Sequence, residues 1–150
     1  MGASMKGITR KVVMIAGTFD LLHPGHVHLI HEANSLGDVT AVIGTDTIVK
    51  KLKGKAPIIP ERQRRYMIEN LKGIKHAVIG FSTTDFSKII KEIKPDIILM
   101  GPDQQPSNEK MEEFVQRAGA QCEIRRLESR ITNFSLTSTT GILERIKHGD

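Results

Sequence analysis

Short apolar runs alternate with amphipathic segments along the whole chain. The runs are rich in β-branched residues and end at glycine, proline or polar residues, which is typical of buried strands. They predict strands over residues 11–16, 39–44, 76–80, 96–100 and 121–127. Apolar positions at helical spacing predict helices over residues 25–36, 61–71, 86–93, 107–118 and 138–147. We expect the lysine-rich segment 45–60 to be a loop closed by prolines.

This alternation of strand and helix predicts the fold class. The strands are too apolar to face water, so we expect an α/β fold with a doubly wound parallel sheet that helices cover on both sides. Ligands bind such sheets beyond the carboxyl ends of the strands. Three unusual segments begin there, at residues 17–26, 45–60 and 101–106. We expect one domain over residues 1–150, with residues 1–10 as a loose N-terminal lead.

Composition narrows the classes of partner. The 150 residues carry a net charge of +5, which fits an anionic partner. With one tyrosine and no tryptophan, the chain has few aromatic residues for a surface that stacks on nucleic-acid bases. Its single cysteine, Cys122, argues against a zinc finger and a disulfide framework. No apolar run approaches the roughly 20 residues that span a bilayer, and residues 1–10 lack the apolar stretch of a signal peptide. We therefore expect a cytoplasmic protein with neither a nucleic-acid nor a membrane partner.

The segment GTFDLLHPGH, from Gly17 to His26, is the most informative part of the sequence. It joins a predicted strand to a predicted helix, where free backbone N–H groups and a partial positive charge favour a phosphate. Gly17 and Gly25 permit close approach of the backbone to a ligand, and Pro24 suits the first turn of a helix. His23 and His26 are three residues apart, so both rings can face one bound phosphate.

His26 has a second interpretation, because it shares a helical face with Leu29 and an isolated histidine there would be a core residue. The nearby His23 favours the binding role. His28 and His31 fall on another side of the helix, which argues against a metal site built from all four histidines.

Several basic side chains follow in the predicted loop and helix. Lys51 and Lys53 fit either a solvated surface or a loop that closes over a triphosphate. Arg64 lies on the inward side of its predicted helix and needs an anion there. That anion is either a phosphate or an internal carboxylate such as Asp46, and the sequence leaves both open.

Two later segments also carry polar side chains at the predicted ligand edge. Asp103 follows a buried strand and could hold a ribose hydroxyl. Three consecutive hydroxyl residues stand at the start of the last helix: Ser138, Thr139 and Thr140. One hydroxyl is enough for an N-cap, so binding of a phosphate is an alternative to simple capping. The sequence contains no Walker loop, GxGxxG or HExxH motif.

Taken together, these motifs resemble the cytidylyltransferase-like nucleotidyltransferases. The resemblance is carried by GTFD at residues 17–20, HxGH at 23–26 and STT at 138–140, so it covers nearly the whole chain. It implies a Rossmann-like nucleotidyltransferase fold and the transfer of a nucleotide to a phosphorylated acceptor.

Three further segments resemble the archaeal-type FAD synthases, which transfer AMP from ATP to FMN. They are KKLKGK at residues 50–55, PIIPERQRR at 57–65 and the stretch from KPDII to GPDQ at 94–104. Glycerol-3-phosphate cytidylyltransferases are similar over the same span, but they typically carry tryptophan where this chain has Pro24 and Gln104.

The resemblance also implies roles for individual residues. The histidines would stabilise the transferring α-phosphate, the lysines and the arginine would hold the outer phosphates, and the aspartate would help to fix the nucleoside. The implied catalytic residues are His23, His26, Lys53 and Arg64, and the implied ATP-binding residues include Gly17, Thr18, Phe19, Pro24, Gly25, Lys51, Asp103, Ser138, Thr139 and Thr140. A divalent cation, Mg²⁺ by default beside phosphates, and a homodimer complete the expectation.

The proposed chemistry needs no general base, because a phosphate monoester is already ionised near neutral pH. Catalysis would consist of positioning and electrostatic stabilisation. Two alternatives stay open at this point. One is a cytidylyltransferase that joins CTP to glycerol 3-phosphate or a similar phosphorylated alcohol, and the other is a non-catalytic nucleotide-binding protein.

Overall fold

A computed structural model of the chain describes residues 10–149. The expected N-terminal lead lies outside these residues except for Arg10, which donates a hydrogen bond to the carbonyl of Asn34 and pairs with Asp38. The core of the molecule is a five-stranded sheet in the order β3-β2-β1-β4-β5, with every neighbouring pair parallel. Its strands are β1 (Val12–Gly17), β2 (Asp38–Ile43), β3 (His76–Ile79), β4 (Ile97–Met100) and β5 (Glu123–Arg126).

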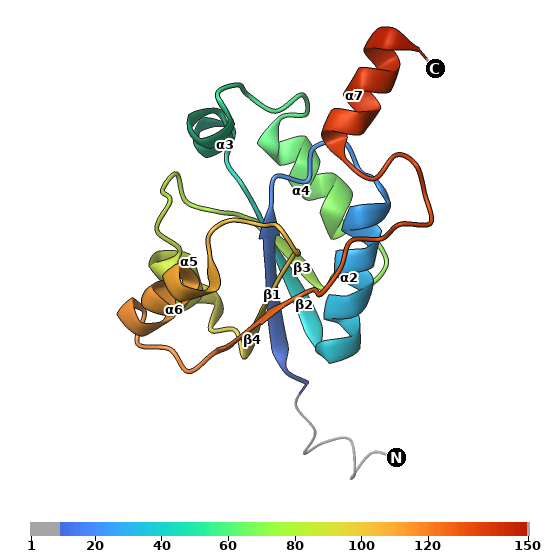
Figure 1. Cartoon of the computed structure of the whole chain (residues 1–150). Coiled ribbons are helices and arrows are strands. Elements are labelled where there is room, and N and C mark those ends of the chain that lie inside the picture. The colour runs from blue at the N-terminus through green and yellow to red at the C-terminus, as the bar shows by residue number, and fades with distance from the viewer. Residues whose placement is uncertain (1–9, 150) are drawn as a thin grey trace.

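Helices cover both faces of this sheet (Figure 1). One face packs against α2 (Pro24–Leu36) and α4 (Glu61–Glu69), and the other packs against α5 (Ser87–Ile93) and α6 (Asn108–Arg117). The expected doubly wound α/β fold is therefore confirmed. The remaining helices are α3 (Asp46–Lys53) and α7 (Thr139–His148).

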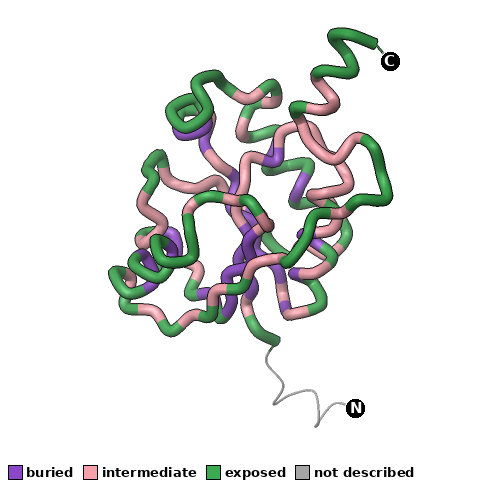
Figure 2. The backbone as a smooth tube through the Cα atoms, in the orientation of Figure 1, coloured by how far each residue is buried: buried purple, intermediate pink, exposed green. Residues whose placement is uncertain are grey.

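The central strands are buried on both faces, as their sequences predict. In β1, Val13 and Ile15 contact the layer of α2 and α4, whereas Met14 between them contacts the layer of α5 and α6. Figure 2 shows the buried residues concentrated in the sheet and on the inner sides of the helices. The edge strand β5 differs, because exposed and half-buried residues alternate along it.

The segment 45–60 is not a loop throughout, and that expectation was wrong. Residues 46–53 form α3, whose N-cap Thr45 accepts a hydrogen bond from the Ile48 N–H at 3.1 Å. The helix ends at Gly54, which adopts the left-handed conformation with φ of 83°. A threonine cap, an acidic first turn and a terminal glycine are ordinary helix signals, but the run of lysines obscured them.

The chain order of the sheet reverses between β1 and β4, so the segments that follow these two strands diverge at that point. Such a reversal leaves a crevice beyond the carboxyl ends of the strands, where ligands of open α/β sheets bind. Among residues 10–149, none of the helices is both long and apolar enough to cross a membrane.

Candidate active site

Two histidines at the start of α2 hold each other in place. His23 is the N-cap, and its Nδ1 accepts a hydrogen bond from the Gly25 N–H at 3.1 Å. The Nδ1 of His26 in turn accepts the His23 N–H at 3.3 Å, which makes a reciprocal capping box. The ring centroids lie 3.8 Å apart. The two rings therefore lie side by side, and the phosphate that both were expected to face stays a prediction.

These hydrogen bonds determine which ring nitrogen carries the proton. Each Nδ1 accepts a backbone N–H, so each neutral ring is protonated at Nε2. The two Nε2–H groups are therefore the donors that His23 and His26 offer to a ligand. An anion beside them would receive two oriented hydrogen bonds without any rearrangement of the protein.

Both imidazoles are neutral in this environment. Burial lowers the pKa of His23 below its usual 6.5. Burial lowers the pKa of His26 to about 4, with smaller contributions from repulsion by His23, when that ring is protonated, and by Lys53. Near neutral pH the histidines therefore supply hydrogen bonds, and the positive charge comes from other residues.

Gly25 is required by this close packing. A Cβ at this position would lie 2.9 Å from Cε1 of His23 and 3.4 Å from the carbonyl oxygen of Thr137. A side chain there would push the ring of His23 away from its capping position. The glycine of the HPGH motif thus permits the histidine pair to form.

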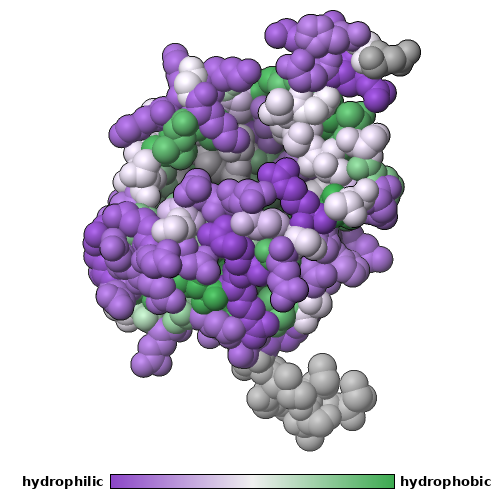
Figure 3. Space-filling model, in the orientation of Figure 1, coloured by the Kyte–Doolittle hydropathy of each residue, from purple (hydrophilic) through white to green (hydrophobic). Residues whose placement is uncertain are grey.

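A cleft of about 740 Å³ opens at the carboxyl ends of the strands. Figure 3 shows this face of the molecule hollowed beside α3. Of the predicted site residues, those that line the cleft are Gly17, Thr18, Phe19, His26, Lys53 and Asp103. His23 reaches it through its contact with His26. Lys51, by contrast, is exposed on α3 and does not line the cleft.

Arg64 differs most from its predicted role, because it lies inside the protein and not in the cleft. It is only 1% exposed and does not line the cleft, so it is not placed to hold the outer phosphates of a nucleotide. Its guanidinium donates to Asp46 Oδ1 at 2.6 Å and to the carbonyl oxygens of Thr18, Gly44 and Ile59 at 2.7 Å each. Of the two interpretations that the sequence left open, the internal ion pair is the correct one.

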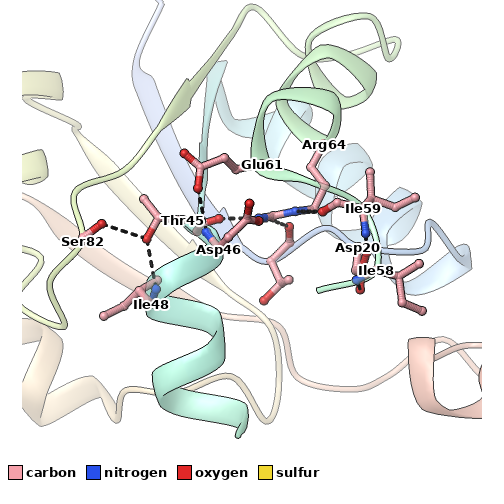
Figure 4. Close-up of polar contacts among 11 residues, drawn as sticks. Asp20, Thr45, Asp46, Ile48, Ile58, Ile59, Glu61, Arg64 and Ser82 are labelled. Carbon is pink, nitrogen blue, oxygen red and sulfur yellow. Dashed lines mark hydrogen bonds and ion pairs between the residues drawn. The ribbon is translucent and has the colours of Figure 1, made fainter. Parts of the chain in front are cut away.

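The bonds of Arg64 join three segments that surround the cleft (Figure 4). They are the turn after β1, the end of β2 and the segment before α4. Buried carbonyl oxygens need donors, and one planar guanidinium satisfies three of them together with a carboxylate. Arg64 is therefore a positioning residue that fixes the walls of the site.

Asp20, the last residue of the GTFD motif, supports the same region. Its two carboxylate oxygens accept the backbone N–H groups of Ile58 and Ile59 at 2.8 and 2.9 Å (Figure 4). The acidic residue in the motif thus attaches the segment between α3 and α4 to the turn after β1. No role was assigned to Asp20 from the sequence. Its position within the GTFD motif was the one feature that could have suggested a role.

A second arginine, Arg126, organises the opposite wall. From β5 it donates to the carbonyl oxygens of Gly101 and Gln104 at 2.8 Å and of Pro106 at 3.0 Å. The Gln104 amide also donates to the carbonyl of Ala16 at 2.6 Å, which joins this loop to β1. Sequence reasoning missed Arg126, because nothing in the sequence distinguishes it from other arginines of an edge strand.

Asp103 sits on the loop that Arg126 holds. It lines the cleft, and its Oδ2 accepts a hydrogen bond from Arg130 at 2.6 Å. Both side chains are more than half exposed, so this ion pair lies at the mouth of the cleft. Asp103 therefore lies at the cleft, and its contact with a ribose hydroxyl stays a prediction.

The start of α7 lies beside the start of α2. Ser138 caps α7 by accepting the Gly141 N–H at 2.9 Å, and the Thr139 hydroxyl donates to the carbonyl of Leu21 at 3.3 Å. Thr140 is exposed. None of the three lines the cleft, so capping and attachment to the HPGH segment are what the structure assigns to Ser138 and Thr139.

The site therefore combines oriented neutral donors with one cationic side chain. His23 and His26 offer N–H groups, and Lys53 lines the same cleft with a positive charge. Within residues 10–149, no three His, Cys, Asp or Glu side chains are grouped so that they could hold a metal ion. The arrangement can bind and orient phosphate groups.

Comparison with known proteins places this geometry in context. The family model described as cytidylyltransferase-like matches residues 14–145. The curated FAD synthase of Methanopyrus kandleri is 39% identical over 140 residues, which cover 91% of each chain. That of Methanobrevibacter smithii is 40% identical over 144 residues and 93% of each chain.

Solved structures agree on the fold. The lipopolysaccharide core biosynthesis protein from Thermoplasma volcanium is 33% identical, with a TM-score of 0.75 over 82% of this chain and 99% of that protein. A pantoate-beta-alanine ligase from Francisella tularensis, complexed with beta-gamma ATP and beta-alanine, is 14% identical with a TM-score of 0.59. It covers 99% of this chain and 76% of its own and shows similarity of fold alone.

Proposed function

This chain belongs to the cytidylyltransferase-like family, and from that premise we propose that it transfers AMP from ATP to FMN, producing FAD and pyrophosphate. The observation that carries the proposal is the paired HPGH histidines beside Lys53, in a chain 39–40% identical to curated FAD synthases. These relatives match over at least 91% of both chains.

The proposed reaction makes one bond and breaks one bond. An oxygen of the FMN phosphate attacks the α-phosphorus of ATP, and the bond from that phosphorus to the bridging oxygen of pyrophosphate breaks. The attacking oxygen belongs to a phosphate monoester that is ionised near neutral pH. No proton has to be removed, which fits a cleft where the histidines are positioned as donors.

The main barrier is electrostatic, because two anions must approach one another. His23 and His26 would donate from Nε2 to oxygens of the α-phosphate, where charge accumulates as the new bond forms. Lys53 would neutralise the departing pyrophosphate, and the N–H groups of Thr18 and Phe19 would contact the nucleotide. Arg64 and Asp20 support this arrangement from behind by holding the cleft walls.

A divalent cation is part of the proposal as a component of the substrate. Mg²⁺ prefers phosphate and water oxygens and usually enters such sites on the nucleotide. We therefore assign it to the ATP complex, and no step by the chain's own residues runs through it. We further propose that the enzyme works in the cytoplasm and forms a homodimer, as its family resemblance implies.

The test is pyrophosphate release by the purified protein with Mg²⁺ and either ATP or CTP, each combined with FMN or glycerol 3-phosphate. We expect release with ATP and FMN, with FAD identified by chromatography. Release only with CTP would replace the proposal by a cytidylyltransferase. Nucleotide binding with no release in any combination would favour a non-catalytic nucleotide-binding protein.

A further inference from the structure

The cleft has two chemically different ends. Toward β1 and β4 it is bounded by backbone of the Gly17–Phe19 turn and by the polar side chains of Asp103 and Gln104. Toward β2 and β3 it is bounded by apolar side chains from α3 and from the segment that leads into α5. The lining residues at this apolar end are Ile48, Val49, Leu52, Phe81, Phe86 and Ile89.

The apolar end is a compartment with two joined walls. Val49 of α3 and Ile89 of α5 are buried, while Leu52 is 66% exposed at the rim. The Ser82 hydroxyl donates to Thr45 Oγ1 at 3.2 Å, which links the segment after β3 to the N-cap of α3 (Figure 4). The compartment is therefore largely formed before any ligand arrives.

Its rim carries hydroxyl groups that can face a ligand. Thr83 and Thr84 line the cleft and are exposed. Thr83 Oγ1 accepts the backbone N–H of Asp85 at 3.1 Å, so its own O–H remains available as a donor. An apolar compartment with a few oriented polar groups is the usual form of a site for an aromatic small molecule.

The proposed reaction supplies a ligand of that kind. FMN carries a planar tricyclic ring with one methylated apolar edge and one edge of carbonyl and N–H groups, joined by a polyol chain to its phosphate. The phosphate must lie in the middle of the cleft, near His26 and Lys53. The ring then extends toward one end, and burial of its apolar area favours the end lined by apolar and aromatic side chains.

We propose that the compartment between α3 and residues 80–86 binds the tricyclic ring of the acceptor, with the Thr83 hydroxyl donating to a ring carbonyl. The adenosine of ATP then occupies the opposite end, beside Asp103. This assignment rests on the proposed function for the identity of the acceptor, but its evidence is the shape and chemistry of the compartment.

The test fills the compartment by the substitution Val49→Trp, with Lys50→Trp as the matched control. Lys50 is exposed on the same helix and does not line the cleft. The dissociation constant of FMN is measured by its own fluorescence without ATP, and the KM values of both substrates are measured by pyrophosphate release. We expect Val49→Trp to weaken FMN binding at least about tenfold while the KM of ATP changes less than about twofold. Lys50→Trp should match the parent protein.

Circular dichroism will show whether Val49→Trp folds correctly. If it does not, the conservative variant Thr83→Val provides a second test of the same compartment. Removing the hydroxyl should weaken FMN binding by about threefold to tenfold. Unchanged FMN affinity in the correctly folded variants, or a rise in the KM of ATP instead, would overturn the assignment. The parent protein could also bind FMN without forming FAD. If Val49→Trp then abolishes FMN binding, the compartment is confirmed as the ring site, and the proposed function is wrong.

Discussion

Replacing His26 by asparagine should remove a pH dependence of stability that arises from its half-buried imidazole. Burial lowers the pKa of His26 to about 4, whereas an unfolded chain has the ordinary value near 6.5. As pH falls below 6.5, His26 becomes protonated in the unfolded chain but stays neutral in the folded protein. Stability therefore decreases as pH falls from about 6.5 to 4, and the loss is complete below the lower value.

The size of the effect follows from the two pKa values. Between pH 7.5 and pH 5, a histidine shifted from 6.5 to about 4 loses about 2 kcal/mol of unfolding free energy. The carboxylates of Asp38 and Asp85 do not contribute over this interval, because their pKa values lie below the ordinary 3.8. Their contribution is lost only in more acidic solution.

Asparagine is the appropriate substitution because its Oδ1 can replace Nδ1 of His26 as acceptor of the His23 N–H. The variant keeps the capping box but cannot titrate. The control is His31→Asn, because His31 is exposed on the same helix.

The assay is urea unfolding followed by circular dichroism at pH 7.5 and pH 5. The parent and His31→Asn should both lose about 2 kcal/mol more than His26→Asn over this interval. An equal loss in all three proteins would refute the argument that the folded protein keeps His26 in its neutral form.

Three other outcomes follow from the site. His23→Ala should lower turnover by roughly 10²–10³-fold with an unchanged circular dichroism spectrum, because it removes one oriented donor; normal turnover after removal of both histidines would refute the mechanism. Arg64→Met should lower the free energy of unfolding, measured with urea, by about 3–5 kcal/mol, because three carbonyl oxygens lose their buried donor; a cost near zero would contradict its positioning role. Arg126→Met should raise the KM of ATP roughly tenfold and leave the KM of FMN nearly unchanged, because only the Asp103 loop loosens; equal changes in both KM values would contradict that division.

The parts of the fold that the sequence predicted are those with a local cause. The strand β1 is a β-branched apolar run, and α2 begins where Pro24 follows a capping residue, so both were predicted within a residue or two. The helix expected over residues 107–118 is likewise observed as α6, which begins after its Ser107 cap and ends at Arg117. Periodicity and capping act over a few residues and are visible without any tertiary information.

The errors arose where composition concealed local signals or where tertiary contacts decided the outcome. The lysines near Lys51 suggested a loop, although Thr45 and Gly54 mark the ends of a helix. The helix α4 buries Arg64 and Ile68, whereas the apolar Met67 between them in sequence is 46% exposed. The helical pattern placed Arg64 on the inward side of this helix, but it did not show that its partners would be the protein's own carboxylate and carbonyl groups.

Some basic residues bind the protein's own backbone and others face the cleft, and this difference explains why the site could be only partly predicted. A sequence shows which residues are cationic, but not whether a cation faces a ligand or the protein's own carbonyl groups. Arg64 and Arg126 satisfy backbone oxygens around the cleft, whereas Lys53 lines it. A fixed guanidinium suits the structural task because it satisfies several acceptors in one plane, and a single ammonium on a long side chain can follow a phosphate that moves during the reaction. The two arginines therefore stiffen opposite walls, and this stiffness allows the neutral His23 and His26 to present their donors without reorganisation.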